Sequence, residues 1–198
     1  MLKTGYEDYP QYNAILGMDE VGYGCGAGDL YVAGVILPKE YSNSEVKDSK
    51  KITSDKKRKR ISDELLNSNI IYCIKSVSVD YINEFGISQA LKIAFQSVSN
   101  ELSGKYDAVF IDGVETRGLN VDADIITVVK GDNTYQNIAA ASIIAKVHRD
   151  EYMVKMNDKY PGYDLSSNKG YLTKNHLLGL KEHGQKEIHR KQYVKNHI

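Results

Sequence analysis

Apolar and polar residues alternate with a period of two in two stretches near the N-terminus. The stretches cover residues 15–18 and 30–37, and this period predicts two strands. Between them a glycine stands at every second position from Gly22 to Gly28. Because glycine has no side chain and adopts positive φ freely, the backbone N–H groups of this segment can face an anion or a sugar hydroxyl. The pattern predicts a glycine-rich hairpin rather than a phosphate-binding loop that opens a helix.

The same reasoning assigns the other elements along the chain. Residues 70–79, 108–111 and 125–129 are β-branched or wholly apolar runs, which predict three further strands. Apolar residues spaced by three and four predict helices at 54–67, 87–102 and 138–159. Thr53 or Ser54 is the expected cap of the first helix, Asp80 caps a short helix, and Thr173 caps a last helix that ends near His183.

Carboxylates follow three of these strands. Asp19 and Glu20 end the first strand, while Asp112 and Asp132 follow the strands at 108–111 and 125–129. Neighbouring side chains of a strand point to opposite faces, so one of the first two acids should face the core, where it needs a partner or a metal. Each aspartate alone could be a turn former or a helix cap. Gathered at one edge of an α/β sheet, the four acids would form a site for a hard cation.

Composition limits the classes of protein to be considered. A chain of 198 residues with 41% apolar residues, 26% charged residues and no net charge is expected to fold as one globular domain. A basic run at 47–60 is either a solvated helix face or a phosphate-binding surface. Two cysteines and the lack of a signal peptide or a membrane-spanning run predict a cytoplasmic protein with reduced thiols.

Seven motifs occur in the order GMDEVGYG, DSKKIT, FIDG, VVKGD, IAAASIIAKVHRD, NKGYLTKNH and IHRKQY. Together they resemble bacterial ribonuclease HII from residue 15 to about residue 194. The resemblance implies the α/β ribonuclease H-like fold, a mixed five-stranded sheet with helices on both faces. It implies a single catalytic domain over 1–198, with a small C-terminal helical segment from about 161 that contacts substrate.

The resemblance also implies an activity. The family hydrolyses the RNA strand of RNA/DNA hybrids and nicks duplex DNA 5′ of an embedded ribonucleotide, leaving 3′-hydroxyl and 5′-phosphate ends. Asp19, Glu20, Asp112 and Asp132 match its catalytic ligands for two Mg²⁺ or Mn²⁺ ions. Two alternatives stay open: a hybrid-binding protein of the same fold with impaired catalysis, and another metal-dependent nuclease such as a resolvase or integrase.

Substrate-binding residues are carried over by motif. Gly22, Tyr23 and Gly24 match the loop that reads the ribose 2′-hydroxyl, and Tyr171 matches the tyrosine that stacks on the next sugar. The positions expected to contact phosphates are Lys50, Ser142, Lys146, Lys169, Thr173, His176 and Arg190. Tyr23 stands where the family usually has arginine, and Asp29 where it prefers proline. We expect a monomer that binds RNA/DNA hybrids or ribonucleotide-containing duplex DNA and no membrane.

Overall fold

The computed structural model describes residues 1–197, and Ile198, the end of the predicted domain, lies outside the described residues. Five strands form one sheet in the order β3-β2-β1-β4-β5. They are β1 (Ile15–Val21), β2 (Leu30–Ile36), β3 (Ile71–Val77), β4 (Ala108–Asp112) and β5 (Asp124–Val128). The β1–β2 and β2–β3 pairs are antiparallel, whereas β1–β4 and β4–β5 are parallel. The predicted hairpin and the mixed five-stranded sheet are therefore confirmed.

The helices are close to the predicted ones. They are α1 (Asp55–Leu66), α2 (Val79–Phe85), α3 (Ile87–Glu101), α4 (Gln136–Lys159), α5 (Leu165–Asn168), α6 (Lys174–His183) and α7 (Lys191–Val194), with 3-10 turns η1 (Ser49–Lys51) and η2 (Gly131–Asn133). Ser54 and Thr173 cap α1 and α6 as predicted. Asp80 was the wrong cap for α2, because the Ser78 side chain accepts the hydrogen bond from Tyr81 N. The helix capped by Thr173 is not the last one, since α7 follows it.

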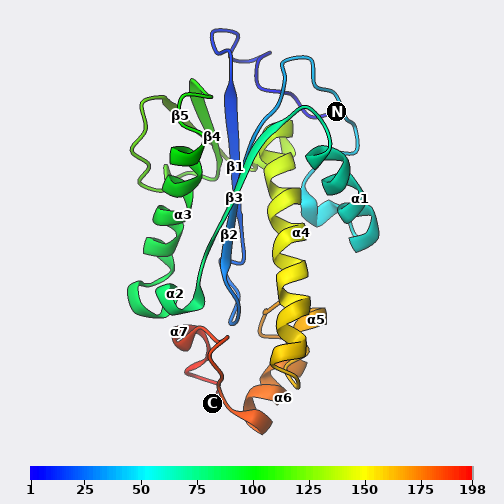
Figure 1. Cartoon of the computed structure of the whole chain (residues 1–198), viewed down its shortest axis with the longest axis vertical. Helices are drawn as coiled ribbons and strands as arrows, with labels where there is room; N and C mark the ends of the chain where they lie inside the picture. The colour runs from blue at the N-terminus through cyan, green and yellow to red at the C-terminus, as the bar shows by residue number, and fades with distance from the viewer. Residues whose placement is uncertain (198) are drawn as a thin grey trace.

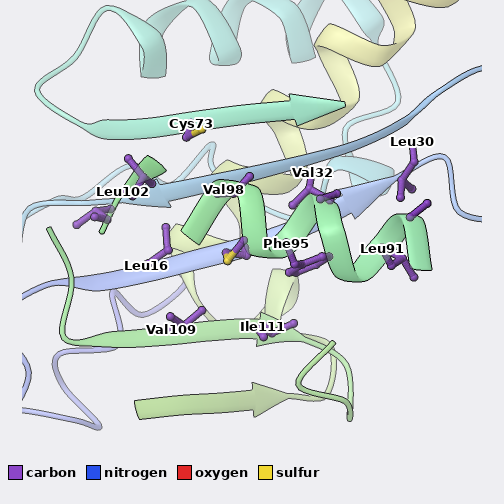
Figure 2. Packing of buried hydrophobic residues seen from close by; sticks show 14 of the residues in the cluster. Leu16, Leu30, Val32, Cys73, Leu91, Phe95, Val98, Leu102, Val109 and Ile111 are labelled. Carbon is purple, nitrogen blue, oxygen red and sulfur yellow. The ribbon is translucent and has the colours of Figure 1, made fainter. Parts of the chain in front are cut away.

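Helices cover both faces of the sheet (Figure 1). On one face α3 buries Leu91, Phe95 and Val98 against the strands, as Figure 2 shows. On the other face α1 and the alanine-rich start of α4 pack over β2. Gly17 permits the close approach of α4 to β1, because a Cβ at that position would meet the backbone of Asn137 in α4. The close approach of α4 to β1 fixes the position of α4 relative to the carboxylates of β1.

The C-terminal segment lies at one end of the sheet (Figure 1) and packs around its own cluster, which includes Met153, Tyr163 and Leu180. It also contacts the glycine-rich turn between β1 and β2. The N–H groups of Gly26 and Ala27 donate to Gly170 O, at 2.9 and 3.2 Å. The chain thus brings its N-terminal glycine loop and its C-terminal segment, which are far apart in sequence, into direct contact.

Candidate active site

The parallel pairing of β1 and β4 places two of the predicted acids at the same edge of the sheet. Met18 pairs with Ile111, so Asp19 and Asp112 follow at neighbouring positions. Asp132 lies in η2, shortly after β5 ends. The alternation of side chains in β1 turns Asp19 into the interior, where it is 7% exposed. The fold therefore brings Asp19, Glu20, Asp112 and Asp132 together.

Burial and mutual repulsion shape the charges of this cluster. Burial raises the pKa of Asp19 well above its usual range, and the negative charges of Glu20, Asp112 and Asp132 raise it further. A hydrogen bond from Ser142 opposes the rise. Burial also raises the pKa of Glu20, against the lowering effect of Arg117. The positive charges of Arg117 and Lys50 therefore offset the burial of Glu20 only in part.

Backbone and amide donors hold the remaining acids in place. Gly131 N donates to Asp112 Oδ1 at 2.6 Å. Asn133 Nδ2 donates to Asp132 Oδ1 at 2.9 Å and to Asp48 Oδ2 at 3.2 Å. Asp48, within the DSKKIT motif, is a fifth acid that sequence reasoning missed. Asp48 is buried. The pKa of Asp132 is raised first by the burial of Asp132 itself, then by the charge of Asp112, and then by the charge of Asp48.

The donor set fits a divalent cation. Within residues 1–197, no three His, Cys, Asp or Glu side chains stand close enough to hold an ion as they are placed. However, the four carboxylates supply the hard oxygen ligands that Mg²⁺ and Mn²⁺ prefer. Glu20 Oε2 is buried and has no hydrogen-bond partner among the described residues. A cation between the acids would satisfy this oxygen and offset their repulsion.

Lys50 lies on the exposed side of the cluster, directly after the buried Ser49. Burial acts to lower the pKa of Lys50, but the charges of Asp19, Asp132 and the other nearby acids raise it more, so the net shift is upward. The ammonium group is therefore fully charged at neutral pH and faces the acids.

Two buried arginines hold the glycine loop, here defined as residues 22–28. Arg190 Nη1 donates to Gly22 O at 2.6 Å and to Tyr23 O at 3.0 Å, while its Nε and Nη2 donate to Gly28 O. Arg149 donates to the carbonyls of Ala27, Asp29 and Lys169. Because Arg190 is fully buried, our prediction that it contacts a phosphate was wrong. Its side chain positions the loop that carries Tyr23.

The exposed part of the loop carries free donors. Tyr23 is 48% exposed and Gly24 is exposed. Within residues 1–197, no acceptor lies against the N–H groups of Tyr23 and Gly24, whereas those of Gly26 and Gly28 donate to Gly170 O and Ile188 O. The loop therefore offers backbone N–H donors to a ligand at its tip and uses the others internally.

The segment around Tyr171 contains one further correction. Tyr171 is 48% exposed and its backbone follows Gly170, which accepts from the glycine loop. His176 is fully buried, so the prediction of a phosphate contact was wrong for this residue as well. Its Nδ1 donates to Tyr171 O at 2.9 Å. Thr173 Oγ1 accepts from His176 N and caps α6, while the Thr173 residue itself stays exposed.

The other predicted phosphate contacts have partners within the protein. Ser142 Oγ lies 3.0 Å from Ser49 Oγ, next to Asp19. Lys146 Nζ pairs with Asp150 Oδ1 at 2.6 Å, and Lys169 Nζ donates to Ser166 O. Asp150 therefore pairs with Lys146, and the neighbouring Glu151 pairs with Lys59.

Asp29, whose purpose the sequence left open, has a structural role. Its Oδ1 accepts from Val79 N at 3.1 Å, at the start of α2, and Tyr152 donates to the same carboxylate. Asp29 therefore joins the end of the glycine loop to α2 and α4 and does not face the four clustered acids.

Comparisons with known proteins agree with this geometry. The family model for ribonuclease HII matches residues 16–197. A ribonuclease HII of Natranaerobius thermophilus is 39% identical over 178 residues, which cover 89% of this chain and 88% of that protein. A ribonuclease HII of Caldicellulosiruptor saccharolyticus is 38% identical over 196 residues, 99% of this chain and 91% of that protein.

Solved structures give the same fold. The chain is similar to the protein in the structure of the PCNA:RNase HII complex from Archaeoglobus fulgidus, with a TM-score of 0.78, 26% identity, and coverage of 91% of this chain and 95% of that one. Bst-RNase HIII in complex with Mn²⁺ has a TM-score of 0.69 at 16% identity, and the match covers 93% of this chain and 68% of that one. Within residues 1–197, no helix combines the length and apolar character needed to cross a bilayer. The chain belongs to the ribonuclease HII family, whose members are metal-dependent endonucleases.

Proposed function

We propose that this chain hydrolyses the RNA strand of RNA/DNA hybrids and nicks duplex DNA 5′ of an embedded ribonucleotide, leaving 3′-hydroxyl and 5′-phosphate ends. One observation carries the proposal. The fold gathers Asp19 and three further carboxylates at one edge of the sheet, and Asp19 lies on β1, the strand that leads into the glycine loop. That loop is hydrogen-bonded to the segment of Tyr171. Groups for cleavage and groups for reading a sugar therefore lie on connected backbone.

In the proposed mechanism Asp19, Glu20, Asp112 and Asp132 hold Mg²⁺ or Mn²⁺. When bound, a pair of such ions supplies an activated water and stabilises the charge that develops on the leaving 3′ oxygen. The protein fixes the carboxylate oxygens that face this site. Gly131 N orients Asp112, and the hydrogen bond from Ser142 orients Asp19.

The remaining residues position the substrate. The N–H groups of Tyr23 and Gly24 are free to donate to a ribose 2′-hydroxyl, which distinguishes RNA from DNA. The exposed ring of Tyr171 stacks on the sugar of the following deoxynucleotide. The side chains of Lys50, Lys146, Lys169 and Thr173 lie outside this junction and contact phosphates, which position the duplex without reading it. Ser142, expected from the sequence to contact a phosphate, instead donates its one hydroxyl hydrogen to Asp19.

The test is a cleavage assay with three substrates. Purified protein is incubated with Mg²⁺ or Mn²⁺ and an RNA/DNA hybrid, a DNA duplex with one ribonucleotide, or a plain DNA duplex. We expect cleavage of both ribonucleotide-containing substrates and none of plain DNA. Binding of the hybrid without cleavage would favour the hybrid-binding alternative, and cleavage of plain DNA would favour a different nuclease of the same fold.

We also propose that the chain acts as a monomer. Light scattering coupled to size-exclusion chromatography tests this directly. A mass near 22.2 kDa is expected, and a mass of twice that value would contradict it.

A further inference from the structure

A groove of about 440 Å³ lies beside the carboxylate cluster and contains none of the lysines expected to bind phosphates. Its walls come from the glycine loop, the first turns of α3 and the connection between β4 and β5. Its polar lining includes Tyr23, Ser88, Gln89, Lys92 and Arg117. Tyr23 lies both in the groove and at the tip of the glycine loop. A nucleic-acid strand bound at the loop would therefore continue into the groove.

Arg117 is a partly buried cation with an unused hydrogen-bond donor. Its side chain is 19% exposed, and its Nε is buried with no partner among the described residues. Its Nη2 lies 3.5 Å from Glu20 Oε1, and its Nη1 lies 3.7 Å from Glu115 Oε2. Charge-assisted hydrogen bonds are usually about 2.7–2.9 Å long, so both contacts are loose. The guanidinium is partly desolvated, its bond to Glu20 is long, and its Nε has no partner among the described residues.

The protein nevertheless fixes Arg117 firmly. Its backbone has φ of 56°, a left-handed conformation that is unfavourable for a residue with a side chain. The guanidinium also lies over the ring of Phe95, with its carbon 5.9 Å from the ring centre. A fixed cation with a free donor is pre-organised for an anion, because little side-chain freedom remains to be lost on binding.

The other groups of the groove suit a nucleotide. Lys92 is exposed and, within residues 1–197, forms no ion pair, while the carbons of its side chain pack against Gly118. Glu115 is the one acid in the lining. The half-exposed ring of Tyr23 offers a face on which a base can stack, and such stacking is independent of sequence.

We propose that this groove is a phosphate-binding subsite for the substrate strand. Arg117 and Lys92 bind a backbone phosphate of the nucleotide next to the one held by the glycine loop, and Tyr23 packs against the base of that nucleotide. The inference rests on the proposed function, because it assumes a nucleic-acid substrate at the neighbouring loop. No covalent step is involved, and the subsite contributes affinity and register.

Binding of a fluorescent RNA/DNA hybrid, measured by anisotropy in EDTA over a range of salt concentrations, tests the subsite without cleavage. Arg117→Gln should weaken binding about tenfold at low salt and reduce the slope of log affinity against log salt by about one. Lys92→Gln should reduce the slope in the same way with a smaller loss, about threefold. Lys105→Gln, which removes an exposed lysine before β4, is the matched control and should leave both unchanged.

Lys92→Gln keeps the test decisive if Arg117→Gln lowers the melting temperature. Salt slopes equal to that of the wild type in both variants would overturn the subsite. A wild type that binds the hybrid but does not cleave it with metal would defeat the proposed function and leave the subsite standing. If the wild type cleaves the hybrid and both variants keep its salt slope, the proposed function stands and the subsite is overturned. Equal competition by free mononucleotide at the same phosphate concentration would also overturn the assignment to a strand.

Discussion

The imidazole rings of His176 and His189 meet with their Nε2 atoms 3.1 Å apart, and both side chains are fully buried. His176 Nδ1 faces Tyr171 O at 2.9 Å and must donate to it, because a carbonyl only accepts. His176 Nε2 therefore accepts from His189 Nε2, and His189 Nδ1 accepts from Lys186 N at 3.0 Å. This series of hydrogen bonds requires both rings to be neutral. It connects His189 to the backbone of Tyr171.

Stability should consequently fall in mild acid. Burial and, second, repulsion from the neighbouring His176 ring lower the pKa of His189 to about 4, whereas an unfolded histidine titrates near 6.5. Between these values the unfolded chain binds a proton that the folded chain does not, so the free energy of unfolding decreases as pH falls from about 6.5 to about 4. The loss from this residue should reach about 3 kcal/mol. Urea denaturation at several pH values measures it.

The variant His189→Gln isolates this effect from that of other titrating groups. It should be less stable than the wild type at pH 8, and the difference should shrink toward pH 4. His197→Gln removes an exposed histidine and should follow the wild-type curve. If His189→Gln keeps the full wild-type dependence on pH, the histidine pair is not its source.

Local patterns were enough to predict most of the fold. The strands of the hairpin follow from their period of two, and Ser54 and Thr173 cap their helices because a side-chain oxygen can satisfy a free N–H group. Asp80 failed as a predicted cap because Ser78, two residues earlier, can perform the same function. Capping depends on which of several competent neighbours has the extended backbone, and sequence spacing alone does not determine this.

The roles of the charged side chains were less predictable. Arg190 and His176 are polar residue types in motifs associated with substrate, yet both are buried. Carbonyls of the distant glycine loop accept the hydrogen bonds of Arg190, and His176 bonds to Tyr171 O and to the ring of His189. Arg117 gave no signal in the sequence, since its importance comes from its position beside Glu20, 97 residues away. These roles arise from tertiary contacts, which no local pattern records.

Replacement of Asp19 separates metal binding from folding. Asp19→Asn should abolish cleavage but change hybrid affinity in EDTA by less than about twofold, because the lost carboxylate serves the metal. Removing one of several buried, repelling charges should not lower the melting temperature in EDTA. The rise in melting temperature on addition of Mn²⁺ should be smaller than in the wild type. Cleavage assays, anisotropy and thermal denaturation measure the three effects.

Asp158→Asn is the matched control for this experiment, since Asp158 is exposed on α4. It should retain cleavage and the full thermal response to Mn²⁺. Persistent cleavage by Asp19→Asn would show that Asp19 is not an essential metal ligand.

Arg190 should tolerate no other cation. Its planar guanidinium donates to three carbonyls, of Gly22, Tyr23 and Gly28, whereas lysine has one nitrogen on a flexible stem. Arg190→Lys would leave buried carbonyls without donors and should lower the free energy of unfolding by about 3 kcal/mol. Urea denaturation measures this loss. Arg60→Lys, on the exposed face of α1, should behave as the wild type, and equal effects in the two variants would contradict the role of Arg190.

Tyr23 is the position at which substrate preference should be adjustable. Arg190 holds Tyr23 O, so a new side chain at this position leaves the loop backbone in place. Tyr23→Arg adds a cation beside the substrate phosphates and should raise incision at single ribonucleotides relative to hybrid cleavage, by about threefold to tenfold. Initial rates on the two substrates measure this ratio. Tyr23→Phe keeps the ring without the hydroxyl and should leave the ratio unchanged. If Tyr23→Arg also leaves it unchanged, the preference depends on the backbone of the loop and not on this side chain.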